Sequence, residues 1–396
     1  MVDAHTVKVN FSEPFAPFLQ AASTAYLGFY SPKAIKENGS KLGAGGPADV
    51  GTGPFVFTGY TKGQSAVFTR NPDYNWAPPS ANHQGPAYLE KLTIRFLTED
   101  SVRVGALSSG QVQVAEPIPP ADVRTVQGDP KLRTIATDAP GANYALVLNT
   151  TKAPLDDPKV RKAVQRGIDL DTDIQSVYFG VYKRAWSPIA PSTPYYDKSL
   201  EKSWPYDKAA AEKALDEAGW TARDGEGYRT KDGKRLTAEQ PYVQTFVSAQ
   251  NHTFDVGVQD ALKQVGIELK LVPLDSAGSI GRTGKGDYDV FAFAWQGSDP
   301  SLLGNLYHSK SQFGGGGANG SRVKDAEIDG WLDQAEATVD AAQRAELYRK
   351  VQRKIVDQAY SFPAYIATMD VARHGKVNGL LLDVDANTDF YGIGVA

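Results

Sequence analysis

The stretch of residues 144–182 constrains the fold more than any other part of the chain, because it joins a strand to two helices through short turns. It opens with the apolar run YALVL, whose side chains alternate about the backbone and indicate a strand. Pro158 then stands where a helix best accepts proline, its first position, with Asp157 before it as the expected N-cap. Asp169 starts a second helix, and Gly180 ends it. The helical spacing predicts one buried face, formed by Val160, Ala163, Val164 and Ile168.

Further along, strands and helices alternate in the order typical of an α/β protein. Tyr242–Val247 and Ile267–Leu271 are expected strands on either side of a helix, which predicts a right-handed crossover and a parallel pair. Tyr288–Trp295 is a continuous apolar strand, short enough to be buried on both faces. Near the end, Asp340 is the expected start of a helix, with Gln343 placed for a capping box.

Length and composition exclude several classes of protein. With 396 residues the chain is too long for one core and suits two lobes. The net charge of −4 and the lack of a basic run with interleaved aromatic residues argue against nucleic acid as a partner. The absence of cysteine removes disulfides, thiol catalysis and zinc–thiolate sites. No run approaches the ~18 apolar residues that a membrane span requires.

The run PLDDPKVRKAVQRGIDLDTDI resembles the segment PFDDPRVRQALAYAIDREAIV, which is typical of the peptide- and nickel-type solute-binding proteins of ABC importers. Further segments resemble the same family, among them GTGPFVFTGY and YDKAAAEKALDEAGW. The resemblance implies an α/β fold of the periplasmic-binding-protein type, with two lobes joined by a hinge. It also implies mixed and parallel sheets with helices on both faces. Lobe I is then expected to comprise residues 1–140 and 361–396, and lobe II residues 141–360.

The beginning of the sequence departs from this family. The run VKVNFSEPFAPFL resembles a segment that normally lies well inside the first lobe, so we expect that lobe to be incomplete and to lack its N-terminal portion. The opening MVDAHTVKVN has neither the basic start nor the apolar core of an export signal. The resemblance implies an extracytoplasmic protein, in the periplasm or anchored at the cell surface, and a cytoplasmic location is the alternative.

The candidate ligand contacts follow from the resemblance and are weighed against ordinary core packing. Trp295 ends an expected strand, where open α/β sheets bind ligands, but it could equally be a core residue. Relatives that hold a peptide's free amine carry an aspartate three residues after this tryptophan, where this chain has Ser298. Asp299 could substitute for that aspartate or merely cap a turn. The other candidates, at the expected crossings between the lobes, are Tyr365, Asn143 and Tyr144.

The sequence contains no complete catalytic or cofactor-binding motif among those considered. The five histidines are isolated and form no His-x-x-x-His pair, so we expect no metal site. The stretch Gly278–Gly286 resembles a phosphate loop, but its spacing is one residue too long and it ends on glycine where Ser or Thr is needed. Neither a catalytic residue nor a cofactor is therefore predicted.

The sequence thus predicts a monomeric solute-binding protein rather than an enzyme. As the resemblance implies, it would capture a small solute between its lobes and deliver it to ABC permease subunits. The solute would be an oligopeptide, a modified peptide, a glycan or a related metabolite. The alternative is an enzyme or a ligand-sequestering protein that evolved from the same fold, in the cytosol or in a biosynthetic pathway.

Overall fold

The structure, a computed structural model, describes residues 3, 5–46 and 48–396. The chain forms two compact units. Unit 1 comprises Met1–Phe18 and Asp138–Thr368, and unit 2 comprises Leu19–Thr137 and Met369–Ala396. The expectations that concern the start at Met1 lie outside the described residues.

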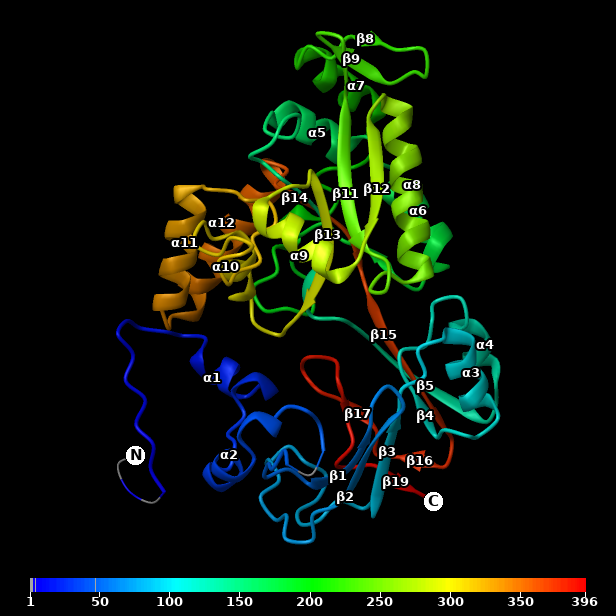
Figure 1. The fold of residues 1–396 in the computed structure, drawn as a ribbon, viewed down its shortest axis with the longest axis vertical. Coiled ribbons are helices and arrows are strands. Elements are labelled where there is room, and N and C mark those ends of the chain that lie inside the picture. The colour runs from blue at the N-terminus through cyan, green and yellow to red at the C-terminus, as the bar shows by residue number, and fades with distance from the viewer. Residues whose placement is uncertain (1–2, 4, 47) are drawn as a thin grey trace. The chain divides into compact units, whose positions relative to one another are not determined.

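Unit 1 contains residues 144–182, the strand followed by two helices (Figure 1). Its helices are α5 (Pro158–Arg166), α6 (Leu170–Tyr178), η3 (Lys198–Leu200), α7 (Lys208–Glu217), α8 (Ala249–Val265), α9 (Ser276–Lys285), α10 (Leu302–Tyr307), α11 (Ala326–Ala337) and α12 (Ala341–Asp357). Its strands are β6 (Gly141–Leu148), β7 (Lys183–Arg184), β8 (Ala222–Arg223), β9 (Arg229–Lys231), β10 (Lys234–Arg235), β11 (Thr237–Val243), β12 (Glu268–Leu274), β13 (Val290–Gln296) and β14 (Ser361–Ile366).

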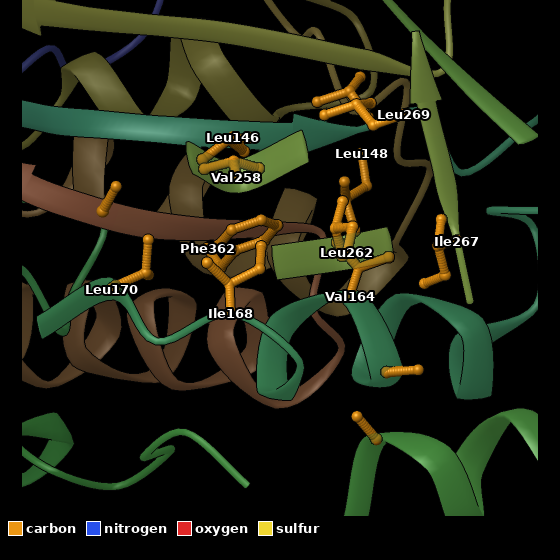
Figure 2. Close-up of a cluster of buried hydrophobic side chains, with 14 of the residues drawn as sticks. Leu146, Leu148, Val164, Ile168, Leu170, Val258, Leu262, Ile267, Leu269 and Phe362 are labelled. Atoms are coloured by element: carbon orange, nitrogen blue, oxygen red, sulfur yellow. The ribbon is translucent and has the colours of Figure 1, made fainter. Parts of the chain in front are cut away.

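The centre of unit 1 is an antiparallel sheet in the order β13-β6-β14-β7. Every residue of β6 is buried, as expected for a strand with a neighbour on each side and helices over its faces. One apolar cluster joins β6, β14, β11 and β12 to helices α5–α8, and Figure 2 shows part of it. A second cluster gathers helices α10–α12, which Figure 1 draws in orange apart from the green α5–α8. Val160, Ala163 and Val164 form a buried face of α5 as predicted, whereas Ile168 is also buried but lies after the helix has ended at Arg166.

The predicted strand–helix–strand unit is present, but the bounds predicted for its first strand, Tyr242–Val247, are wrong. That strand is β11 and ends at Val243, and residues 244–247 form a turn. Strands β11 and β12 pair in parallel, and α8 between them packs against β12. Parallel and antiparallel pairs therefore occur in the same unit, which gives the mixed α/β fold expected from the sequence.

Unit 2 holds two three-stranded sheets, in the orders β1-β2-β3 and β4-β15-β5. Its strands are β1 (Phe55–Thr61), β2 (Ser65–Arg70), β3 (Lys91–Arg95), β4 (Val114–Ala115), β5 (Leu132–Asp138), β15 (Thr368–His374), β16 (Val377–Asn378), β17 (Leu381–Leu382), β18 (Thr388–Asp389) and β19 (Gly394–Val395). Its helices are α1 (Phe18–Ala22), η1 (Ala25–Leu27), α2 (Pro32–Asn38), η2 (Gly39–Lys41), α3 (Asp100–Ser108) and α4 (Val123–Gly128).

Candidate functional site

Trp295 lies near the end of β13 with 41% of its surface exposed. β13 is the outer strand of its sheet, and Trp295 is paired with Ala142 of β6. The sequence predicted a strand buried on both faces, and this prediction is wrong for its second half. Residues 288–290 are buried, residues 291–293 are half-buried and residues 294–296 are exposed, because the strand leaves the core as it runs toward Trp295. A large aromatic ring at the open end of an outer strand is well suited to contact a small molecule.

The turn after Trp295 carries the two polar candidates. Asp299 accepts a hydrogen bond from the backbone N–H of Ser301 at 2.8 Å, just before α10. Its Oδ1 also lies 3.7 Å from the guanidinium of Arg344, and both side chains are largely buried. Ser298 is partly buried. The carboxylate of Asp299 therefore already has a cation and a backbone donor within unit 1.

Tyr144 and Tyr365 come together in the core of unit 1. Their rings stack with centroids 4.6 Å apart and an angle of 8° between the planes, and both residues are buried. The Tyr365 hydroxyl donates to Oδ1 of Asn251 at 3.0 Å, and Tyr178 donates to the same oxygen at 2.9 Å. Phe254 meets Tyr365 edge-on at 5.5 Å. These rings belong to a packed aromatic cluster, and their polar atoms bond inside it.

Asn143 and the hydroxyl of Tyr144 are likewise occupied inside the unit. The amide of buried Asn143 donates to the carbonyl of Ser187 at 2.8 Å. The Tyr144 hydroxyl donates to Asp255 at 3.3 Å. Burial raises the pKa of Tyr144 well above its usual value, and it raises the pKa of Asp255 to about 6. Of the six candidates, Trp295 alone is exposed. Asn143 and Tyr144 lie on β6, which pairs with the strand of Trp295, and Tyr365 lies on β14, the next strand of the same sheet.

The Asp255→Asn variant is expected to change how stability depends on pH. Because the folded-state pKa of about 6 lies above the unfolded value, the folded form binds a proton more tightly. The wild-type free energy of unfolding therefore falls as the pH rises from about 4 to about 6, by up to about 3 kcal/mol from this group. The variant should be more stable than wild type at pH 8 and similar near pH 4. Urea unfolding at both pH values measures this difference, and a gap independent of pH would contradict it.

Two residues that support this region were missed by sequence reasoning. Arg344 is on α12, far from Asp299 in the sequence, and nothing local marks the pairing. Gly141 begins β6 with a φ of +100°, and an added Cβ would lie 2.3 Å from the carbonyl oxygen of Trp295. Its glycine identity and the proline before it were the only available signal.

No group of three or more His, Cys, Asp or Glu side chains in residues 3, 5–46 and 48–396 is arranged to hold a metal ion. Within the same residues, no helix has the length and apolar character needed to cross a membrane.

The chain is similar to proteins of one known family. The model of bacterial extracellular solute-binding proteins, family 5 (middle region), matches residues 1–317. The probable D,D-dipeptide-binding periplasmic protein DdpA of Escherichia coli is 26% identical over 389 residues, which cover 96% of this chain and 70% of DdpA. Di/tripeptide-binding protein 2 of Pseudomonas aeruginosa is 28% identical over 401 residues, covering 98% of this chain and 70% of that protein.

Solved structures agree on the fold. NikA from Brucella suis, in complex with Fe(III)-EDTA, matches with a TM-score of 0.83 and 26% identity, over 98% of this chain and 76% of that one. DppA from Helicobacter pylori, in complex with the peptide STSA, matches with a TM-score of 0.80 and 24% identity, over 97% of this chain and 71% of that one. The α/β fold is thus the periplasmic-binding-protein fold. Since the family model spans most of the sequence, the chain belongs to family 5 of the bacterial extracellular solute-binding proteins.

Proposed function

We propose that this protein binds a short peptide, or a small solute of related chemistry, and presents it to the permease of an ABC importer. The observation that carries the proposal is an exposed tryptophan, Trp295, at the open end of β13 in a member of a solute-binding family. The mechanism is binding and release of an unaltered solute.

The names of relatives favour peptides as the solute class. DdpA is named for D,D-dipeptides, and several Pseudomonas aeruginosa relatives at 26–28% identity are named for dipeptides or tripeptides. Other relatives are named for haem and glutathione, so the family fold accepts other chemistries. The Helicobacter pylori protein is described as ABC-transporter-associated, which supports a permease as the partner.

In this proposal Trp295 provides an apolar face for the solute, and Ser298 provides a polar contact in the turn that follows. An indole offers a large contact area with few rotatable bonds to immobilise. Tyr144, Tyr365 and Asn143 do not contact the solute in this proposal. Their packing and hydrogen bonds hold β6 and β14 in place, and β13 is paired with β6.

Asp299 has a limited role in this proposal. Its carboxylate faces Arg344 and accepts from the N–H of Ser301. A ligand amine would have to compete with a cation that is already in place, so its gain would be smaller than that of an unpaired buried carboxylate. Recognition is therefore proposed to rest mainly on the indole and on backbone groups rather than on a free amine.

The lobe boundaries 1–140 with 361–396 and 141–360, and a closing motion about a hinge, stay predictions. An extracytoplasmic location is proposed from family membership, since the family is described as extracellular. Hydrogen–deuterium exchange with and without solute tests the motion, because closure would protect residues on both sides of positions 138–143 and 358–364.

Replacing Trp295 with alanine is expected to weaken solute binding about tenfold to a hundredfold, the usual effect of removing a contacting aromatic anchor. Native mass spectrometry of the purified protein first identifies any solute that is retained. Calorimetric titration of wild type and variant with that solute, or with the dipeptide Met-Leu as the probe, then gives the affinities.

Trp76→Ala is the matched control, because Trp76 is 52% exposed but lies in unit 2. The control should bind as wild type does. Equal affinity of wild type and the Trp295 variant would place the site elsewhere. Chemical conversion of the retained solute by the wild-type protein would instead favour the recruited-enzyme alternative over a binding protein.

A further inference from the structure

A pocket of about 510 Å³ is lined entirely by residues of unit 2, whereas the residues assigned to solute binding belong to unit 1. Four chain segments form it. They are the residues after α3 with Gly110, the turn before β5 with Lys131, the turn between β15 and β16 with His374, Gly375 and Lys376, and β19 with Val395. The pocket therefore exists only in the folded unit.

The walls are fixed by backbone hydrogen bonds between these segments. The N–H of Gly375 donates to the carbonyl of Lys131 at 2.8 Å, and the N–H of His374 donates to the carbonyl of Gln113 at 2.9 Å. Lys376 is held in turn, since its carbonyl accepts from the N–H of Ala396 at 2.9 Å. These bonds fix the backbone of the pocket before any ligand arrives.

Most of the surface that lines the pocket is apolar, and the charged groups among its lining residues are all basic. Lys131, His374 and Lys376 contribute three basic groups, and no Asp or Glu lines it. Across the described part of the chain, none of these three side chains lies within 4 Å of a carboxylate as an ion pair. Asp129 is adjacent, but its Oδ1 accepts from the backbone N–H of Lys131. This concentration of positive charge stands out in a chain with a net charge of −4.

Neighbouring arginines add to the charge without filling the pocket. Arg133 donates to the carbonyls of Pro130 and Leu132, and Arg373 donates to the carbonyl of Val377. Among the described residues, no carboxylate forms an ion pair within 4 Å of either guanidinium group. These hydrogen bonds hold the backbone at Pro130 and Val377, two residues that line the pocket.

His374 has one nitrogen left for a ligand. Its Nε2 lies 2.8 Å from the carbonyl oxygen of Leu107, and because a carbonyl only accepts, Nε2 must carry the hydrogen. Nδ1 has no partner among the described residues. In this neutral tautomer Nδ1 only accepts, and it can donate to an anion only when the ring is protonated.

We propose that this pocket in unit 2 binds a phosphate monoester group through Lys131, His374 and Lys376. Such a group carries a charge of about −1.5 to −2 near neutral pH and several strong acceptor oxygens, which match two ammonium groups and an imidazole. The phosphate could belong to a soluble metabolite or to the headgroup of an anionic lipid, and both sources present the same chemistry to these side chains.

The experiment titrates the protein of residues 1–396 with glycerol 3-phosphate at low ionic strength and follows binding by calorimetry. The variant Lys131→Ala with Lys376→Ala should bind about tenfold more weakly, as expected for the loss of two partly exposed ionic contacts. The charge-matched control, Lys62→Ala with Lys91→Ala, removes two exposed lysines of unit 2 outside the pocket and should bind as wild type does. Circular dichroism and thermal unfolding establish that both variants fold.

A second arm uses vesicles of phosphatidylcholine with and without phosphatidic acid. Binding of glycerol 3-phosphate that depends on the two pocket lysines supports the pocket with a soluble source. Binding only to phosphatidic acid vesicles, with the same dependence, supports the pocket with a lipid source. Absence of binding to either probe, or equal weakening by the pocket and control variants, overturns the proposal.

Discussion

Replacing Gly141 with alanine is expected to lower the free energy of unfolding by about 2–5 kcal/mol and to weaken solute binding with it. Gly141 has a φ of +100°, which an L side chain rarely adopts. An added Cβ would lie 2.3 Å from the carbonyl oxygen of Trp295 and 2.6 Å from the nitrogen of Gly297. The contact is with backbone on both counts, so no side-chain rotation can relieve it. The end of β13 must move, and Trp295 must move with it.

Gly281→Ala is the matched control for this substitution. Gly281 lies within α9, has no atom within 4 Å of an added Cβ, and has an ordinary backbone conformation. The control substitution should therefore leave the free energy of unfolding unchanged or raise it by up to about 1 kcal/mol, because alanine has a higher helix propensity than glycine. Urea unfolding and calorimetric titration of both variants separate the two cases. A Gly141 variant as stable as the control, with unchanged affinity, would show that the strand end tolerates displacement.

The sequence predicted the local structure of unit 1 well where a single side chain decides it. Asp157 accepts from the N–H of Lys159, and Asp169 accepts from that of Thr172, as expected of N-caps. Asp340 likewise accepts from the N–H of Gln343. These contacts span two or three residues, so the local sequence suffices to specify them.

The same helix start shows where local reasoning ends. A capping box requires the Gln343 side chain to return to the N-cap residue, but its Oε1 accepts from the hydroxyl of Thr338 instead. The difference depends on which nearby group competes for the Gln343 side chain, and spacing does not encode that competition. At the end of α6 the expected Gly180 has a φ of +78°, and Phe179 before it is left-handed as well, with a φ of +55°.

The candidate site could be predicted only in part, because exposure is set by residues far away in sequence. Tyr144 and Tyr365 are aromatic residues at chain crossings, but each is covered by the other, and Phe254 of α8 packs against both. The apolar run that ends at Trp295 gives no sign that its second half leaves the core. The family resemblance pointed to Trp295 as a ligand contact, and that role stays a proposal.

The aromatic cluster provides the last prediction, since Phe254→Ala should destabilise the protein by about 3–5 kcal/mol, the usual effect of deleting a fully buried ring. Phe254 has no exposed surface and meets Tyr144 and Tyr365 edge-on, at 6.0 and 5.5 Å. Its removal leaves a cavity next to the stacked rings of Tyr144 on β6 and Tyr365 on β14. Neither ring can move into this space without breaking the hydrogen bond of its own hydroxyl. Phe246→Ala removes the same ring from a position that is 77% exposed and should change stability by less than about 0.5 kcal/mol. Denaturant unfolding of both variants measures the difference, and comparable stabilities would mean that the cluster does not hold the sheet together.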